Sequence, residues 1–448
     1  PVVWVLLAGS RMVAQWFQLE PAVETANQYL EGSPLDRFIF SALLAAGLIV
    51  LLARRRWVGT FLRANGPILL FFLYCAASVL WSDYPDVAFK RWIKGFGNVV
   101  MVLVVLTDAN PSAALKRFLS RSGFLLIPLS VLLIKYYPDL GQGYNPWTWD
   151  RYYIGVATGK NGLGFVCLVF GLGSLWRFLE AFQGGERARS ARPLIAHGTI
   201  VAMALWLFWK ADSATSFGCF LMGAGLLVVT SWPALARSPK AIHLLVGAPL
   251  CVSLVGLLLN GWTDVVAVFG RDPTLTGRTL LWNQLLGMTV NPLFGTGFES
   301  FWLGGRMEMF WRMYWWHPNQ AHNGYLEIFL NLGWMGLALL GLVMVWGYRN
   351  VVAAFRLGPE AGRIRLSYFV VAAVYNLTEA AFQGIHVVWI MFLLVITVVP
   401  EGPPREDVIR TEWIPTLELG NSLDCPDQPR ALPFLSSRQE AAHLLPRR

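Results

Sequence analysis

The sequence has few charged residues and few cysteines for its length, and both shortages narrow the class of protein. Of its 448 residues only 14% are charged, whereas 55% are hydrophobic, and the mean hydropathy is +0.49. Soluble domains carry about a quarter charged residues, so this composition excludes an ordinary soluble protein and indicates a membrane protein. The five cysteines are scattered, without CxxC spacing, and four lie within apolar segments. They therefore indicate neither a disulfide framework nor a zinc site.

Several motifs of well-known enzyme classes are also missing. There is no HExxH motif, no repeat at solenoid spacing and no cleavable signal peptide, and His317 and His322 do not share a helical face. The segment 155–161 resembles a P-loop only superficially, because three residues separate its glycines and no Ser or Thr follows Lys160. The net charge of +9 includes no basic run interleaved with aromatic residues. The sequence therefore predicts no metal site, no cofactor and no nucleic-acid partner.

Long apolar segments dominate what the sequence does contain. A helix needs about twenty apolar residues to cross the hydrocarbon core of a bilayer. The segments that meet or approach this length predict an all-α, polytopic membrane protein with about eleven or twelve transmembrane helices, of which the candidate 1–19 is the weakest. The other segments are 36–53, 66–82, 94–107, 122–137, 160–176, 193–210, 213–231, 241–260, 322–347, 364–378 and 383–400.

Lysine and arginine alternate between rich and poor loops along the chain. They are frequent in the first set of loops (54–63, 116–121, 177–192, 237–240, 349–365 and the tail) and sparse in the second (83–93, 138–159, 211–212, 261–321, 379–382). The positive-inside rule places the first set in the cytoplasm and the second set outside it. We expect four regions: N-terminal transmembrane helices in 1–260, one large outer loop in 261–321, C-terminal transmembrane helices in 322–400, and a disordered cytoplasmic tail in 401–448.

The large loop 261–321, together with the residues just after it, contains the best candidates for chemistry. Arg278 precedes an apolar pattern at Leu281, Leu285 and Met288, which predicts a short amphipathic helix with Arg278 in its first turn. An arginine there suits a phosphate or diphosphate, although from the spacing alone snorkelling to lipid headgroups is the favoured explanation. His322 lies where the chain re-enters the membrane, beside Asn323. It could accept a proton from a hydroxyl, or it could be an interfacial or helix-capping residue.

Other polar residues fall at the outer ends of the predicted helices. Ionisable groups at such depths are costly and therefore candidates for function, although pairing with one another could also account for them. Trp282 is one of six tryptophans of the loop, which an aromatic belt at the membrane interface explains most simply and which could also stack on sugars. The residues that we take as candidates for binding a diphosphate or a glycan are Arg91, Lys160, Lys210, Trp282, Asn323 and Glu379.

Three stretches of the sequence resemble the O-antigen ligase and Wzy-type polymerase family. Their order and spacing match over about 70 residues, and three earlier stretches look like the exopolysaccharide-polymerase branch, so that the resemblance covers most of the chain up to Pro400. The family stretches are 277–282, 292–297 and the pair 322–327 with 332–336, and the earlier ones are 81–85, 90–91 and 159–164.

This resemblance implies a bacterial inner-membrane glycosyltransferase of the GT-C type. Such an enzyme takes a glycan from undecaprenyl diphosphate on the periplasmic side and joins it to an acceptor hydroxyl, without a metal. His322 would activate the acceptor, and Arg278 would hold the diphosphate and stabilise its departing charge. Many relatives place a further arginine near 210–216, where this chain has Lys210, a point charge without bidentate geometry. The second diphosphate contact is therefore Lys210, Lys160 or Arg91.

We expect from the sequence a polymerase of undecaprenyl-diphosphate-linked repeat units. The nearest alternative is an O-antigen ligase with a lipid A–core or other acceptor. A polysaccharide or lipid transporter is an alternative of another class, but no repeat symmetry of the transporter kind is visible. A non-catalytic assembly scaffold is a further one. The expected partners are the lipid-linked donor, a glycan or lipid A–core acceptor, membrane lipid, and a chain-length regulator with export proteins.

Overall fold

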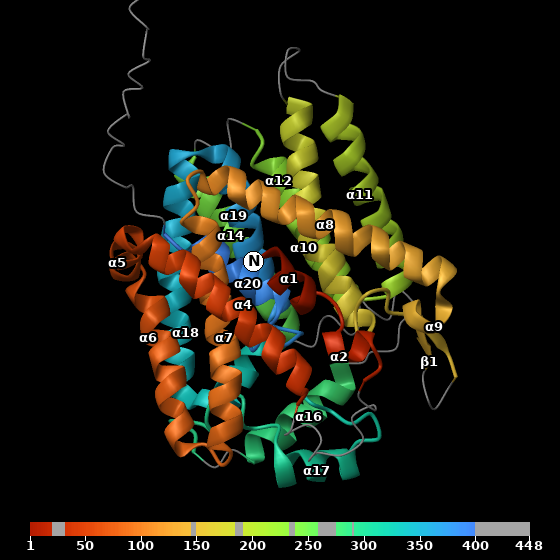
Figure 1. Cartoon of the computed structure of the whole chain (residues 1–448), viewed down its shortest axis with the longest axis vertical. Helices are drawn as coiled ribbons and strands as arrows, with labels where there is room; N and C mark the ends of the chain where they lie inside the picture. The colour runs from red at the N-terminus through yellow and green to blue at the C-terminus, as the bar shows by residue number, and fades with distance from the viewer. Residues whose placement is uncertain are drawn as a thin grey trace, which may run out of the picture. The chain divides into compact units, whose positions relative to one another are not determined.

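The chain folds into a bundle of α-helices, as the apolar segments predict (Figure 1). We analysed a computed structural model, which describes residues 1–19, 32–144, 149–183, 191–232, 238–258, 275–288 and 291–398. Among these residues the one sheet is a two-stranded antiparallel hairpin. The predicted tail 401–448, Trp262 and the first part of the large loop lie outside the described residues, and the division into four regions stays a prediction.

The helices and strands follow one another along the chain in a regular order. They are α1 (Val2–Ala8), α2 (Val13–Trp16), α4 (Pro34–Ala53), α5 (Arg55–Ala64), α6 (Gly66–Ala77), the 3-10 helix η1 (Ser78–Trp81), α7 (Pro85–Leu106), α8 (Pro111–Tyr136), α9 (Pro138–Gly141), β1 (Gln142–Tyr144), β2 (Arg151–Tyr153), α10 (Lys160–Gln183), α11 (Ala191–Ala211), α12 (Ala214–Val229), α14 (Pro239–Leu258), α16 (Leu275–Gly287), α17 (Gly304–Met313), α18 (Gly324–Leu357), α19 (Pro359–Tyr375) and α20 (Val387–Ile396).

Five of the described helices, α4, α8, α10, α11 and α18, are long and apolar enough to cross a membrane. The bent pair Val58–Ala64 and Gly66–Trp81 adds a sixth if it forms one span. The all-α, polytopic fold class is therefore confirmed, but fewer helices pass this test than the eleven or twelve apolar windows. Three further apolar helical segments are shorter: Ala214–Val229, Lys240–Gly256 within α14, and Val387–Ile396. The weak candidate 1–19 forms two short helices, and α7 carries Lys90, Arg91 and Lys94 within its length.

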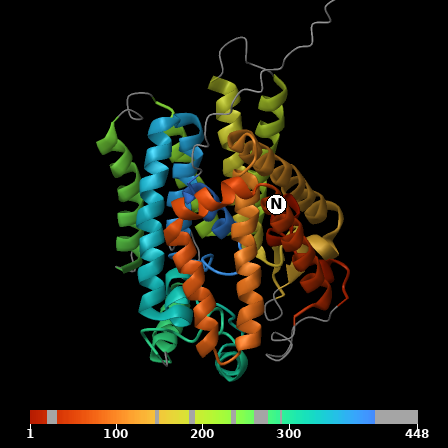
Figure 2. The ribbon, with the colours of Figure 1, turned by 60° about the vertical axis from the view of Figure 1, so that its left-hand side comes forward.

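The short helix α20 is buried on all sides. Every one of its ten residues is buried, and it contacts α7, α10, α18 and α19 (Figures 1 and 2). A helix that is hydrophobic all round lies inside a large core or faces lipid, and here the neighbours replace the lipid. The apolar window 383–400 therefore contains a helix at the centre of the bundle. The packing of neighbouring helices around α20 fixes the position at which this helix begins.

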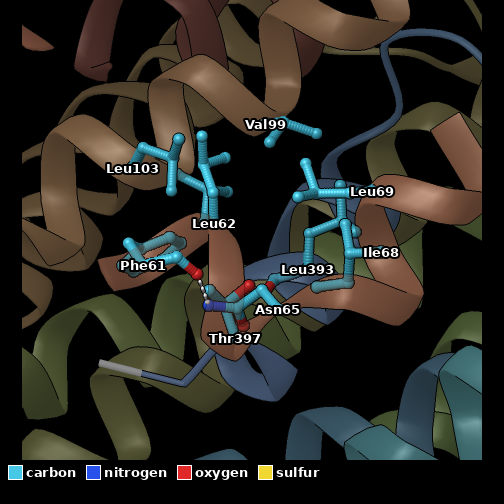
Figure 3. Close-up of a pocket in the computed structure, with 10 residues that line it drawn as sticks. Phe61, Leu62, Asn65, Ile68, Leu69, Val99, Leu103, Leu393 and Thr397 are labelled. Atoms are coloured by element: carbon cyan, nitrogen blue, oxygen red, sulfur yellow. Dashed lines mark hydrogen bonds between the residues drawn. The ribbon is translucent and has the colours of Figure 1, made fainter. Parts of the chain in front are cut away.

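The bend between α5 and α6 encloses a small apolar void (Figure 3). The two helices meet at 88°, and the Asn65 side chain at the bend donates to Phe61 O at 2.7 Å and to Val398 O at 3.0 Å. The void has a volume of about 10 Å³. A single water needs roughly this much space, so the void is a packing feature and not a substrate site. Its role is structural, because Asn65 ties the chain beyond α20 to this bend.

A break in α18 receives the turn 291–297. Gly333 has φ 65° and ψ −164°, which interrupts the helix, and glycine adopts this backbone conformation without the usual side-chain penalty. The turn satisfies backbone groups on both sides of the break through four hydrogen bonds. These run from Trp334 N to Pro292 O (2.9 Å), Met335 N to Leu293 O (3.1 Å), Thr296 N to Leu330 O (3.1 Å) and Gly297 N to Asn331 O (2.8 Å).

Candidate active site

The described part of the large loop has a small hydrophobic core of its own. Helix α16 has the register that the apolar pattern predicts, because Leu281 and Leu285 are both fully buried while Arg278 lies in the first turn. This core holds the loop against the start of α18, and the Trp282 indole donates a hydrogen bond to Ala321 O at 2.7 Å. Its buried members are Leu281, Leu285, Phe301, Trp302, Phe310, Ala321 and Leu330.

A large open cavity, which we call the first cavity, lies where α10, α18 and α20 begin and where α11 and α19 end. Its volume is about 1080 Å³. Four of the five loops that the charge pattern assigns to one side of the membrane contribute to its wall. These segments are far apart in sequence, so their meeting supports the predicted alternation of the helices. The lining residues fall in 150–153, 158–162, 210–212, 315–320 and 375–386, with Phe165.

Glu379 lines this cavity together with Asn161, and it stands at the centre of a polar cluster whose other members, Arg278 and His322, are not among the lining residues. Its Oε1 accepts hydrogen bonds from Arg278 Nη2 at 3.2 Å and from Asn161 Nδ2 at 3.1 Å, and its Oε2 lies 3.2 Å from His322 Nδ1. Arg278 also donates to the backbone oxygen of Thr378. We call Asn161, Arg278, His322 and Glu379 the carboxylate cluster. The structure thus brings together three residues that the sequence singled out separately, across 57 and 101 positions of chain.

The carboxylate cluster keeps Glu379 ionised. The side chain is 7% exposed, and this burial opposes its charge. The hydrogen bond from His322 and the charge of Arg278 outweigh the burial, so that the pKa of Glu379 is lowered from its ordinary 4.5. Glu379 lies between α19 and α20, outside the candidate spans. At neutral pH the cluster therefore contains a fixed negative charge beside a guanidinium and an imidazole.

This arrangement determines which nitrogen of His322 is available for proton transfer. An ionised carboxylate only accepts hydrogen bonds, so the Nδ1 that faces Glu379 carries the proton. The opposite nitrogen, Nε2, is then the basic one in the neutral ring. Glu379 would also stabilise the imidazolium that forms when Nε2 takes up a proton. The His322 side chain is 18% exposed, and its ring lies 5.9 Å from that of Trp316 in the cavity wall.

His322 is held in an unusual backbone conformation. Its φ is +51°, and Asp212 and His317, which line the first cavity, have φ values of +50° and +47°. Such left-handed conformations cost non-glycine residues about 1–2 kcal/mol and are concentrated at functional sites. Asn323, the next residue, caps α18 by accepting from the backbone N–H groups of Tyr325 and Leu326, both at 3.0 Å. The Asn323 side chain therefore orients the start of α18, and its predicted contact with substrate stays a prediction.

Two lysines add positive charge to the first cavity. Lys160, the first residue of α10, is exposed and makes no hydrogen bond or ion pair with another described residue. Lys210 lies at the end of α11 among aromatic rings, with its Nζ 4.2 Å from the centroid of Trp209 and 4.8 Å from that of Tyr153. Such cation–π contacts hold an ammonium group in place without neutralising it. Both side chains therefore provide cations for an anionic ligand in this cavity.

Arg91, the third candidate for that role, is placed elsewhere. It is not among the residues that line the first cavity, and its Nη1 donates to Glu299 O at 2.6 Å. The buried Glu299 carboxyl accepts in turn from the backbone N–H of Gly384. Burial raises the pKa of Glu299, and Arg91 partly opposes that rise. Arg91 thus lies behind the segment 376–386 in a packing contact, and its predicted role in binding diphosphate remains untested.

Two further residues shape the site without having been singled out individually from the sequence. Glu327 is 1% exposed and accepts from Trp302 Nε1 at 2.8 Å and from the backbone N–H of Ala321, the residue before His322. His386 caps α20 through Nδ1 and lines the first cavity. Glu327 and His386 each adjoin an apolar run of the sequence. The pattern of such a run predicts a packed helix and gives no sign of a polar role for its neighbours.

The tryptophans of the loop divide between packing and the cavity wall. Trp302 is 5% exposed, and Trp311 stacks on His317 with ring centroids 4.8 Å apart. Trp315 and Trp316 line the first cavity, where the sequence left sugar stacking open as a role. Among the described tryptophans of the loop, Trp282 and Trp302 pack in or against the small core, and Trp316 both packs against that core and lines the cavity.

Comparisons with known proteins point to one family. Residues 189–341 match the family model described as O-antigen ligase, a range that includes α11, α12, Arg278, His322 and the break in α18. The chain is also 25% identical over 289 residues to the exopolysaccharide production protein ExoQ of Rhizobium meliloti (strain 1021). That match covers 63% of this chain and 64% of the relative's length. Residues 189–341 therefore resemble an O-antigen ligase domain, and the chain is similar to proteins of the O-antigen ligase and Wzy-like family. Its apolar helices show a multi-pass membrane protein.

Proposed function

We propose that the protein is an inner-membrane glycosyltransferase that joins undecaprenyl-diphosphate-linked oligosaccharide units into a surface or exopolysaccharide on the periplasmic side. The observation that carries this proposal is the carboxylate cluster, in which Arg278, His322 and Glu379 meet in or beside the wall of a cavity of about 1080 Å³. That volume lies at the upper end of the range of small-ligand pockets and suits an extended substrate such as a glycan with a diphosphate.

The chemistry follows from the positions of the charges. The acceptor hydroxyl loses its proton to Nε2 of His322 as its oxygen attacks the anomeric carbon of the donor. The bond between that carbon and the diphosphate oxygen breaks, and undecaprenyl diphosphate leaves with the bonding electron pair. Arg278 stabilises the charge that develops on the leaving group, and Glu379 stabilises the imidazolium of His322. The proton then passes from His322 to solvent, which restores the base.

Lys160 and Lys210 bind the diphosphate in this proposal. Both line the first cavity and both belong to segments that end at the same level of the bundle. Arg278 has the planar fork that binds two phosphate oxygens at once, whereas each lysine contributes a single compact charge. Membrane lipid, a chain-length regulator and export proteins are the further partners that we propose.

An O-antigen ligase is the second candidate. The family model that matches residues 189–341 has this description, whereas the relative from Rhizobium meliloti is described by exopolysaccharide production. The bond-forming step is the same in both cases, and only the acceptor differs. A polymerase extends the glycan of another lipid-linked unit, and a ligase transfers the glycan to lipid A–core or to another acceptor.

Product size distinguishes the candidates directly. Purified protein, reconstituted in vesicles, is incubated with the undecaprenyl-diphosphate-linked oligosaccharide of its host, and the glycans are separated on a gel. We expect a ladder of products with the unmodified protein and none with His322→Ala. The matched control is His243→Ala, because His243 lies in α14, outside the residues that line the first cavity. A single transfer that requires added lipid A–core identifies a ligase, and no transfer to either acceptor refutes both proposals.

A further inference from the structure

The structure contains a second cavity, of about 380 Å³, at the same end of the bundle. It lies where η1 ends and α7 begins, next to the start of α17, and Figure 1 shows the lower ends of α6 and α7 beside this part of the loop. Among the described residues, it shares none of its lining with the first cavity. The lining residues are Trp81, Asp83, Asn291, Phe294, Gly295, Thr296 and Arg306.

Two aromatic rings form an apolar wall of the second cavity. Trp81 and Phe294 have ring centroids 5.8 Å apart at an angle of 61°, and the Trp81 indole donates to Phe294 O at 3.3 Å. Nevertheless Trp81 is 38% exposed and Phe294 is 40% exposed. Large aromatic residues usually bury more of their surface, so these rings present accessible faces that the fold itself does not use.

Polar groups of both signs form the rest of the wall. Arg306 Nη2 donates to Asp83 Oδ2 at 2.6 Å, and Arg306 Nε donates to Phe301 O at 3.1 Å, which holds the guanidinium in one orientation. Its Nη1 makes no hydrogen bond with a described residue, and the Asp83 side chain is 57% exposed. The Asn291 Oδ1 accepts from the backbone of the turn, which leaves its Nδ2 as a donor. The wall thus presents hydrogen-bond donors from Arg306 and Asn291 and a carboxylate acceptor from Asp83. The positive charge of Arg306 and the negative charge of Asp83 balance each other.

The second cavity is rigid before any ligand arrives. The turn 291–297 is joined to α18 by four backbone hydrogen bonds across the break at Gly333. Gly295 has φ +69°, and a Cβ added there would lie 2.4 Å from backbone atoms of Asn331, so a larger residue would displace the turn. A preformed site loses little conformational entropy on binding. Because α18 begins next to His322, the same helix connects the second cavity to the carboxylate cluster.

We infer that the second cavity binds a short stretch of the glycan chain, away from the sugar that reacts. The apolar C–H face of a sugar ring packs on an indole, and its hydroxyls pair with planar donors and carboxylate oxygens. The balanced charge of Arg306 and Asp83 suits a polar, uncharged segment rather than a diphosphate. This inference rests on the proposed function in naming the glycan as the ligand. In that scheme the cavity retains the chain between successive additions.

Binding of lipid-free oligosaccharide tests this inference. The probe is a fluorescently labelled oligosaccharide, prepared by partial hydrolysis of the host's own surface polysaccharide, without lipid or diphosphate. We expect the full-length protein in nanodiscs to bind it, and Trp81→Ala and Asn291→Ala to bind it about tenfold more weakly. The matched control is Trp232→Ala, because Trp232 is 58% exposed but follows α12 and lines neither cavity. Trp81→Phe should retain most of the affinity, because it keeps an aromatic face.

The outcome separates this inference from the proposed function, because the binding assay requires no transfer. If Trp81→Ala and Asn291→Ala both bind the oligosaccharide as tightly as the unmodified protein and unfold at the same temperature, the second cavity is not a glycan-binding site. This conclusion holds even if transfer is observed. Loss of affinity in these variants supports the second cavity even if no transfer is observed, and the glycosyltransferase proposal alone then fails. Equal weakening in Trp232→Ala also contradicts the inference, because the effect would not be local.

Discussion

The two cavities at this end of the bundle use ionisable groups in opposite ways. In the first, Glu379 gathers Arg278 and His322, and two lysines add positive charge nearby. In the second, Arg306 and Asp83 neutralise each other beside two exposed aromatic rings. The lining of the first cavity contains three basic side chains, Arg151, Lys160 and Lys210, and three acidic ones, Asp150, Asp212 and Glu379. What distinguishes it is a base and a guanidinium held by one carboxylate, which suits a developing anion, whereas a single balanced pair beside aromatic faces favours a neutral, polar ligand. The comparison suggests that reaction and retention of the glycan are divided between neighbouring sites.

The largest effect should come from removing the base of the first cavity. His322→Ala should slow glycan transfer by about 10²- to 10⁴-fold, which is the usual contribution of a general base. Binding of the lipid-free oligosaccharide should not change, because His322 lies outside the second cavity. Single-turnover transfer and oligosaccharide binding should be measured on the same preparation, with His243→Ala as control. Transfer at the normal rate in His322→Ala would remove this residue from the mechanism.

Replacement of Arg278 should have the next largest effect on the transfer rate. The size of that effect should depend on the geometry of the replacing side chain as well as on its charge. Arg278→Ala should lower the transfer rate by about 10²- to 10³-fold, since a fixed cation at the leaving group is lost. Arg278→Lys should recover only part of the rate, because a lysine keeps the charge and loses the planar fork. The rates should be compared with that of Arg312→Ala, an exposed arginine in the last turn of α17. Equal rates for Arg278→Lys and the unmodified protein would show that charge alone matters.

Glu379 should affect both transfer and the response of stability to pH. Because its pKa is lowered in the folded protein, its contribution to stability is present above the ordinary value of 4.5. That contribution is lost as pH falls through the lowered pKa. Glu379→Gln should therefore unfold at a lower temperature than the unmodified protein at pH 7, and the difference should shrink at acidic pH. Transfer at pH 7 should fall by about tenfold, or ~1.4 kcal/mol of transition-state stabilisation.

Thermal unfolding in detergent, followed over a series of pH values, measures the first effect of Glu379→Gln. The matched control is Glu308→Gln, because Glu308 is an exposed glutamate of α17. A constant difference in unfolding temperature across the acidic range would contradict the lowered pKa.

Lys160 should show the smallest effect of the four. The side chain is exposed, so solvent screens its charge, and Lys160→Ala should raise the KM for the lipid-linked donor by about threefold to tenfold. Added salt should reduce the difference between variant and unmodified protein. The control is Lys240→Ala, an exposed lysine near the start of α14 that lines neither cavity. A KM that does not change, at low salt, would leave Arg278 and Lys210 as the cations for the diphosphate.

The sequence indicated the individual candidate residues, but it did not indicate which of them contact one another. Arg278, His322 and Glu379 were each recognised from residue type and position at a predicted helix end, but nothing in the sequence indicated that one carboxylate joins them. Glu327 and His386 were not singled out, because each adjoins an apolar run and burial depends on partners distant in the chain. Arg91 was a candidate on the same grounds; in the structure it donates a hydrogen bond to the backbone oxygen of Glu299 and does not line the first cavity, and its role in binding diphosphate stays a prediction.

Local pattern alone determined the membrane class, the all-α fold and the register of α16, because hydropathy and helical periodicity depend on residues close together in the chain. Only the tertiary structure decided that Asn161 and Glu379, 218 positions apart, share a hydrogen bond, and that the turn 291–297 fills the break in α18. It also decided that α20 is enclosed by protein. An apolar helix has the same composition whether its neighbours are lipid or other helices, so only packing distinguishes a lipid-facing span from a central helix.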